Sequence, residues 1–237
     1  MKRHYNYEKR KLTPIRYTIF LIAFLSQLVF LFFFAIVGHF ESGDSSSDIL
    51  KNISGIGGLA STITMCILAI YGAVLLNKII IENYIGENRI RVYLYPYGRK
   101  KLFLLKVKCF VLVFLKFQFL GLVLSNVIFL LVEFVFPIVN SGEGIFSNLL
   151  MAINSSIASS LITLVVILFS GVIGIRFSSL PATIVSSIVL VVILGNLIAM
   201  SFAANVFLCL LVAIALTVLI YFIIVYAGVR IENEDVV

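Results

Sequence analysis

Hydrophobic residues form six long runs along the chain, and short polar segments separate them. The runs cover residues 17–37, 57–81, 102–136, 147–175, 180–200 and 205–229. A helix rises ~1.5 Å per residue, so each run is long enough to cross the ~30 Å hydrocarbon core of a bilayer. A helix also pairs its own backbone N–H and C=O groups, which lipid cannot do. The pattern therefore predicts an all-α integral membrane protein with six transmembrane helices.

The first run follows a basic segment, as the hydrophobic part of a signal peptide does. It is too long for that role, and no small-residue cleavage site follows it, so we interpret it as a retained transmembrane helix. Two parts are expected: a basic cytoplasmic segment over 1–16 and a single six-helix domain over 17–237.

Composition supports the membrane class, because 62% of the 237 residues are hydrophobic and only 12% are charged. A soluble domain of this size would need a larger polar surface. The three cysteines, Cys66, Cys109 and Cys209, all lie in hydrophobic runs, where we expect them to act as packing residues.

Basic residues decide the expected orientation. They cluster before the first run and between the second and third, and single arginines follow the fourth run (Arg176) and the sixth (Arg230). The remaining links hold only Lys51 beside several acids. By the positive-inside rule, both termini are expected in the cytoplasm. The net charge of +7 is then a topology signal. It does not predict nucleic-acid binding, because the basic residues flank spans instead of forming one soluble face.

The link between the second and third runs, 82–101, is longer than two helices need. Its residues Ile90, Tyr93 and Leu94 are spaced for one apolar face of a short helix. Pro96 and Gly98 then end that helix. The third run is overlong, and its first turns, with Lys106 and Lys108, are expected to emerge on the cytoplasmic side.

This link resembles a motif of ABC transporter permeases of the type-2 exporter class. An acidic residue ends the second span, an amphipathic helix follows, and then come Tyr-Pro-x-x-Arg-Lys-Lys and a Lys seven residues after the Arg. The matching positions are Glu82, Glu87, Leu94, Pro96, Arg99, Lys100 and Lys106. The basic N-terminal segment, six spans and small outer loops agree with the same layout.

The resemblance implies a permease subunit in the plasma membrane, of bacterial type, that forms half of a translocation path. A second, identical or related permease subunit and cytoplasmic ABC ATPase subunits are the implied partners, with membrane lipid around them. ATP and Mg would act only through the ATPase. The short helix would be the coupling helix that docks on the ATPase, carried by Glu82, Glu87, Arg91, Leu94, Tyr95, Pro96, Arg99 and Lys100. The cargo implied is an amphipathic peptide, such as an antimicrobial or toxin, or a lipid.

One departure concerns the outer side. Many members of the family carry short re-entrant helices before the sixth span, and 201–204 leaves no room for them. That favours the smaller branch, which handles peptide export or immunity. Three alternatives remain open: the link could be an ordinary basic loop near anionic lipid, and the chain could be a stand-alone membrane protein such as a bacteriocin-immunity protein, or a secondary transporter.

Motifs for chemistry are missing from the sequence. There is no Gly-x-x-x-x-Gly-Lys-Ser/Thr phosphate loop and no His-Glu-x-x-His, so we expect neither enzyme activity nor a cofactor or metal site in this chain. ATP hydrolysis would need another polypeptide.

Polar residues inside the runs have two interpretations. A possible translocation path is lined by Gln27, Lys116, Gln118, Asn154 and Asn196, although the amides could equally be hydrogen-bond glue between helices. Lys116 could instead be a lysine at the cytoplasmic interface. Glu133, near the outer end of the third run, is expected to be hydrated. A face of small residues predicts close packing, either within the subunit or with a second one; it comprises Ser155, Ser156, Ser159, Ser160, Gly171 and Gly174.

Overall fold

The computed structural model describes residues 10, 12–40, 52–85, 98–137, 139, 145–204 and 206–233. Six α-helices and one 3-10 helix run through this part of the chain. They are α2 (Thr13–Phe40), α4 (Ile53–Ile79), η2 (Ile81–Tyr84), α6 (Arg99–Val135), α7 (Ile145–Arg176), α8 (Leu180–Ala204) and α9 (Val206–Asn233).

Five of these helices are long and apolar enough to cross a membrane: α2, α4 with η2, α6, α7 and α9. The class of a helical membrane protein is therefore supported. The predicted span 180–200 coincides with α8, whose apolar part within the described residues is the shorter stretch Leu180–Asn196. The count of six spans and the cytoplasmic location of the termini stay predictions.

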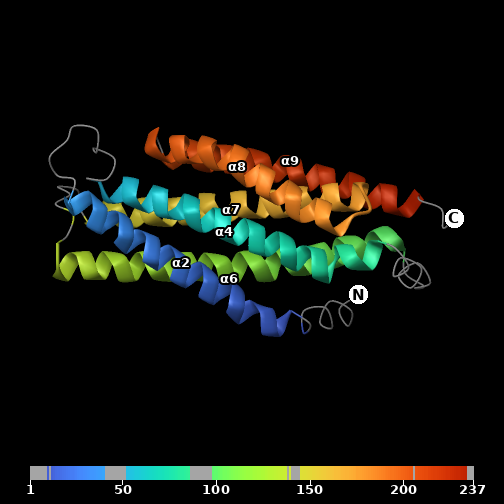
Figure 1. Cartoon of the computed structure of the whole chain (residues 1–237), viewed down its shortest axis with the longest axis horizontal. Coiled ribbons are helices and arrows are strands. Elements are labelled where there is room, and N and C mark those ends of the chain that lie inside the picture. Colours follow the sequence, from blue (N-terminus) through green and yellow to red (C-terminus); the bar gives the residue numbers. More distant parts are fainter. Residues whose placement is uncertain are drawn as a thin grey trace.

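The helices form an elongated bundle in which successive helices run in opposite directions (Figure 1). α2 begins and α9 ends toward the same end of the bundle, where α6 also begins and α7 ends. The basic residues of Arg99–Lys108, with Lys78, Arg176 and Arg230, lie there, and we call this the basic end. The opposite end is named the apolar end, because Phe136, Phe146 and Phe207 are exposed on it.

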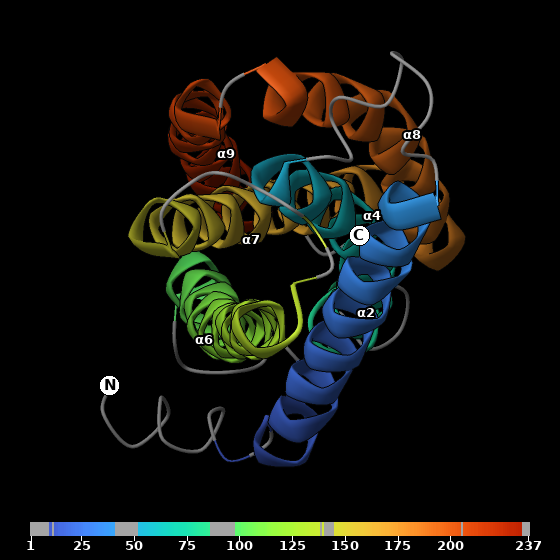
Figure 2. The ribbon, with the colours of Figure 1, turned by 90° about the vertical axis from the view of Figure 1, so that its left-hand side faces the viewer.

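α7 is the central helix of the bundle. It packs against α4, α6, α8 and α9, which surround it in the end-on view (Figure 2). In its most hydrophobic stretch 72% of residues are buried, against 22% in α9. The predicted face of small residues belongs to this helix, and all six of its members are buried within the subunit. Within one subunit, then, these residues serve packing between helices.

Small residues also bring α2 and α6 together. A Cβ placed on Gly121 of α6 would lie 2.8 Å from Ala23 Cβ and 3.0 Å from the carbonyl oxygen of Phe20, both in α2. One turn further, Ser125 Oγ donates a 2.8 Å hydrogen bond to the carbonyl oxygen of Phe24. Backbones this close gain van der Waals contact, which drives helix association where hydrophobic burial cannot.

Candidate functional site

The predicted coupling residues lie at the basic end or outside the described residues. Glu82 is exposed on η2, and Arg99 and Lys100 are partly exposed in the first turn of α6. Glu87, Arg91, Leu94, Tyr95 and Pro96 fall in 86–97, outside the described residues. The structure therefore describes the two ends of the link and not the expected coupling helix.

The first end of the link is anchored by two buried side chains of η2. Tyr84 is 5% exposed, and its ring meets the Phe103 ring edge-on at 5.4 Å between centroids. Lys106 Nζ lies 5.8 Å from the centre of the same Tyr84 ring, a cation–π distance. These contacts hold the end of α4 against the start of α6.

Ile81, the other anchor, is completely buried and reaches the central helix. Its Cδ1 would lie 3.6 Å from a Cβ at Gly171 and 3.6 Å from one at Gly174, which is ordinary van der Waals contact, so Ile81 packs over two glycines of α7. A methyl group at Gly171 would strike Leu76 of α4 first, and one at Gly174 would strike Thr183 of α8 first. The link is thus in contact with the helix at the centre of the bundle.

The second end of the link is held by α9. A Cβ at Gly228 would lie 3.4 Å from Lys100 Cγ and 3.7 Å from Leu104 Cγ, which is ordinary van der Waals contact. A Cβ at Gly98 would lie 3.9 Å from Oε1 of Glu232. The link therefore leaves packed structure near residue 85 and returns to packed structure near residue 98.

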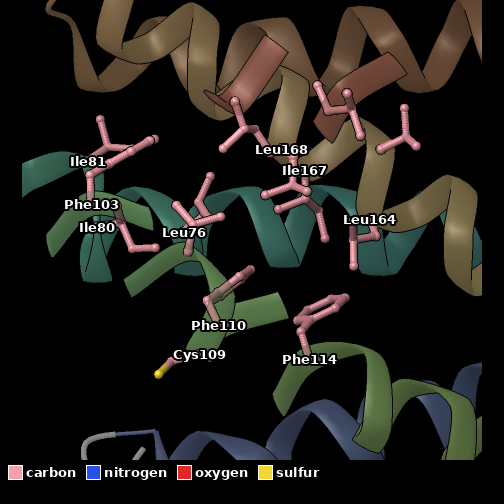
Figure 3. Packing of buried hydrophobic residues seen from close by; sticks show 14 of the residues in the cluster. Leu76, Ile80, Ile81, Phe103, Cys109, Phe110, Phe114, Leu164, Ile167 and Leu168 are labelled. Carbon is pink, nitrogen blue, oxygen red and sulfur yellow. The ribbon is translucent and has the colours of Figure 1, made fainter. Parts of the chain in front are cut away.

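Beneath these anchors lies an apolar cluster, shown in Figure 3, to which α4, α6 and α7 contribute Leu76, Phe110 and Ile167 among others. Phe114 is 1% exposed and packs at the same level: a Cβ on Gly72 of α4 would meet its ring at 2.9 Å and would also strike Ile167. A small apolar cavity, with about 10 Å³ open to the centre of a water molecule, lies between Ile81, Phe103 and Gly171. The cluster is otherwise closely packed, so a displacement of η2 would be passed on to α7.

A second candidate region is a hydrogen-bonded polar network closer to the apolar end. Gln27 Nε2 of α2 donates to Ser61 Oγ of α4 at 3.2 Å and to Asn126 Oδ1 of α6 at 3.1 Å. Asn126 Nδ2 in turn donates to Ser156 Oγ of α7 at 2.9 Å. All four residues are buried, at 5% exposure or less. One network thus joins four helices.

The same network continues along α7 toward the basic end. Ser159 Oγ donates to the carbonyl oxygen of Ser61 at 3.2 Å, and Thr163 Oγ1 donates to that of Ser159 at 2.7 Å. Gln118 Nε2 of α6 donates to Thr163 Oγ1 at 2.9 Å. Hydroxyl and amide groups therefore follow the inner face of α7 over about two turns.

A cavity opens beside this network. The volume that the centre of a water molecule can occupy in this cavity is about 20 Å³, which is enough for about one water. Asn126, Asn148 and Ser155 line it. Asn148 is 4% exposed, and its Oδ1 has no hydrogen-bond partner among the described residues. A water bound there would satisfy this oxygen.

The five predicted path residues do not meet on one surface. Gln27 and Gln118 are completely buried, each hydrogen-bonded to another helix. Asn154 is half-buried, Lys116 is exposed on α6, and Asn196 is exposed on α8 with its amide on the carbonyl of Val192 in the same helix. The two glutamines are placed to hold neighbouring helices together by hydrogen bonds. A role in a transport path stays a prediction for Lys116, Asn154 and Asn196.

Glu133 is buried, so the expectation that it lies at a hydrated surface is wrong. The side chain is 8% exposed, and its Oε1 accepts a 2.6 Å hydrogen bond from the backbone N–H of Val139. Because Pro137 ends α6 and the chain turns back, a carboxylate in the last turn can reach an amide six residues later. Sequence reasoning missed this role, although the proline was a signal that the chain turns there.

No group of three or more His, Cys, Asp or Glu side chains is placed to hold a metal ion within the described residues. Comparison with known proteins finds no matching family model, no similar curated protein and no matching solved structure. The ABC permease resemblance therefore rests on the sequence motif alone.

Proposed function

We propose that the chain is the permease subunit of an ATP-driven exporter, with the link 82–101 as the segment that a separate ATPase moves. The observation that carries this proposal is the packing of the two ends of that link. Ile81 and Tyr84 fix one end to α6 and α7, and the contact of Lys100 with Gly228 fixes the other to α9. This packing would let a displacement of the link reach α6, α7 and α9.

Coupling follows from this packing. ATP binding would close a pair of ATPase subunits and displace the docked link. The displacement would reach α7 through Ile81, and α7 contacts α4, α6, α8 and α9. An ATPase that binds one arrangement of the link more tightly shifts the equilibrium of the whole bundle by that difference in binding energy.

The transport path would lie between two permease subunits, identical or related. Gln27, Asn126 and Gln118 are used inside the subunit, so the path must be built from exposed positions. Lys116 and Asn196 remain candidates, and the apolar surface of the subunit suits an amphipathic cargo, a peptide or a lipid. ATP and Mg would be bound by the ATPase alone.

Copurification tests the partner. The protein is extracted from its native membrane in mild detergent, and bound soluble ATPase is sought by mass spectrometry. We expect an ABC ATPase in stoichiometric amount. Recovery of the chain alone would favour a stand-alone membrane protein or a secondary transporter.

Charge reversal locates the docking surface. The double variant Glu82→Lys with Glu87→Lys is expected to insert normally and to lose the ATPase. Arg176→Glu is the control, because Arg176 is also an exposed charged residue at the basic end but lies outside the link. Equal loss in both would mean that general charge, and not this link, holds the partner.

A further variant separates docking from coupling. Tyr84→Ala removes the ring that contacts Phe103 and Lys106 without changing the exposed surface of η2. The ATPase should still copurify, while stimulation of ATP hydrolysis by cargo should fall. Full stimulation in this variant would contradict the transmission route through η2.

A further inference from the structure

One face of α8 points away from the rest of the bundle. α8 lies at the periphery, where it packs against α4 and α7 (Figure 2). Ser187 and Val191 are among the residues that it buries there. Four exposed residues make up the opposite face, which we call the outer face of α8: Val185, Val189, Val192 and Asn196. At 3.6 residues per turn, these four side chains fall within about 60° of one another around the helix.

The spacing on the outer face is that of a seam between two helices. Its residues follow one another at intervals of four, three and four positions. This is the a/d pattern that keeps one stripe of a helix facing a partner helix. Val189 and Asn196 then occupy equivalent positions, at which valine favours a pair of parallel helices and a single asparagine fixes their register. The three valines are between 50% and 60% exposed, so this seam is unoccupied within the subunit.

Asn196 lies at the depth of the middle of α4. A Cβ on the preceding residue, Gly195, would lie 3.6 Å from Sγ of Cys66. Cys66 is the central residue of α4, which is 27 residues long. α4 therefore extends about 20 Å beyond this depth in both directions, whereas half of the hydrocarbon core measures about 15 Å. A bilayer that surrounds α4 places Asn196 inside the hydrocarbon.

An exposed amide at this depth needs a hydrogen-bond partner. Within the described part of the chain, the Asn196 side chain makes one hydrogen bond, from Nδ2 to the carbonyl oxygen of Val192 in its own helix, and that bond is long at 3.4 Å. Lipid tails offer no donor or acceptor. A lysine such as the exposed Lys116 can extend its amine toward the membrane surface, but an asparagine side chain is too short to do so. Asn196 is therefore placed to pair with another protein helix.

We propose that α8 pairs with α8 of a second copy of this chain through the outer face, with the two Asn196 side chains hydrogen-bonded to each other. A two-fold axis along the membrane normal brings identical residues to the same depth. An amide carries both a donor and an acceptor, so it is complementary to itself. This contact needs no ATPase and does not rest on the proposed function. It assigns Asn196 to the contact between copies and leaves Lys116 as the exposed candidate for a path.

Fluorescence energy transfer between donor- and acceptor-labelled copies measures the association. The purified full chain is reconstituted without any ATPase in phosphatidylcholine vesicles over a range of protein-to-lipid ratios. We expect saturable transfer that an unlabelled copy competes away. Asn196→Leu should weaken association about tenfold, the size expected for a hydrogen bond between helices in a membrane, whereas Asn196→Gln keeps an amide and should weaken it less. A parent protein that stays monomeric, or an Asn196→Leu protein that associates as tightly as the parent, would overturn the proposal.

Cysteine cross-linking locates the contact. Val189→Cys places a thiol on the outer face of α8, and Val218→Cys is the matched control, because Val218 is a valine of similar exposure, 53%, on α9. The vesicles are treated with copper–phenanthroline as the oxidant, and the parent protein gives the background from its own cysteines. We expect a disulfide-linked pair from Val189→Cys and only background from Val218→Cys. A linked pair from Val218→Cys alone would put the contact on α9, and background from both would mean that no second copy lies on α8; either result overturns the proposal.

Discussion

The central helix α7 and the peripheral helix α9 show how this bundle sorts its residues. α9 is the more hydrophobic of the two, yet only 22% of its most apolar stretch is buried, against 72% in α7. Leu211 and Phe222 of α9 are 67% and 66% exposed, whereas Ser156, Ser159 and Thr163 of α7 are completely buried. In a soluble protein the order would be reversed.

The difference follows from the solvent. Lipid is as apolar as leucine, so burying a leucine side chain gains little in a membrane, while small residues allow close backbone contact and hydroxyls can pair with neighbouring helices. The interior of this protein is therefore chosen by small size and hydrogen bonding. Hydrophobicity selects the lipid-facing surface.

The largest contrast is expected from the same truncation on the two sides of the bundle. Phe114→Ala removes a ring that is 1% exposed and packed between α4 and α7, so we expect a loss of about 3 kcal/mol, mainly from the cavity left behind. Phe222→Ala removes a ring that already faces outward and should cost less than about 1 kcal/mol. Unfolding in mixed micelles measures both. Equal losses would mean that α9 is covered by protein.

The next contrast concerns glycine. An added methyl at Gly174 of α7 would strike Thr183 of α8, whose Cβ would lie 3.1 Å away, so Gly174→Ala should destabilise the bundle by about 2 kcal/mol. At Gly228 of α9 the nearest atom would lie at 3.4 Å, and Gly228→Ala should be neutral or stabilising by up to about 1 kcal/mol through helix propensity. The measurement is the melting temperature of each variant relative to the parent protein in the same detergent. A destabilising Gly228→Ala would show that α9 packs more tightly than its exposure indicates.

The smallest contrast concerns hydrogen bonds. Asn126→Leu removes the hydrogen bonds that join Gln27 of α2 and Ser156 of α7 to α6, and should cost about 1–2 kcal/mol. Thr217→Val on α9 removes only a bond to the carbonyl of Ile214 in the same helix, and should change stability by less than about 0.5 kcal/mol. Thermal unfolding of both variants is the measurement. An Asn126→Leu protein as stable as the parent would reduce the polar network to an incidental feature.

Most of the fold could be predicted from the sequence. Six hydrophobic runs give the helices, and α2, α4, α6 and α7 extend only a few residues beyond the predicted runs at most of their ends. Helix formation in lipid is a local requirement of the backbone, so the sequence of each run is sufficient to decide it. The basic residues also gather at one end of the bundle, as the alternation of charged links predicts.

Side-chain partners could not be predicted in the same way. Nothing local distinguishes Gln27, which is buried and bonded to Ser61 and Asn126, from Asn196, which is exposed. Glu133 was expected at a hydrated surface and instead bonds to Val139 because the chain reverses after α6. Rotation of a helix about its axis depends on every neighbour it contacts.

The sequence by itself determined that this chain is helical, which residues form the helices, and where its basic residues gather. Only the tertiary structure decided that α7 is the centre, that its serines and glycines face inward, and that Arg16 lies beside Phe117. The physical reason is the range of the forces. Backbone pairing and solvation act along one helix, whereas close packing and hydrogen bonds between helices depend on residues that lie as far apart in the chain as Gln27 and Asn126.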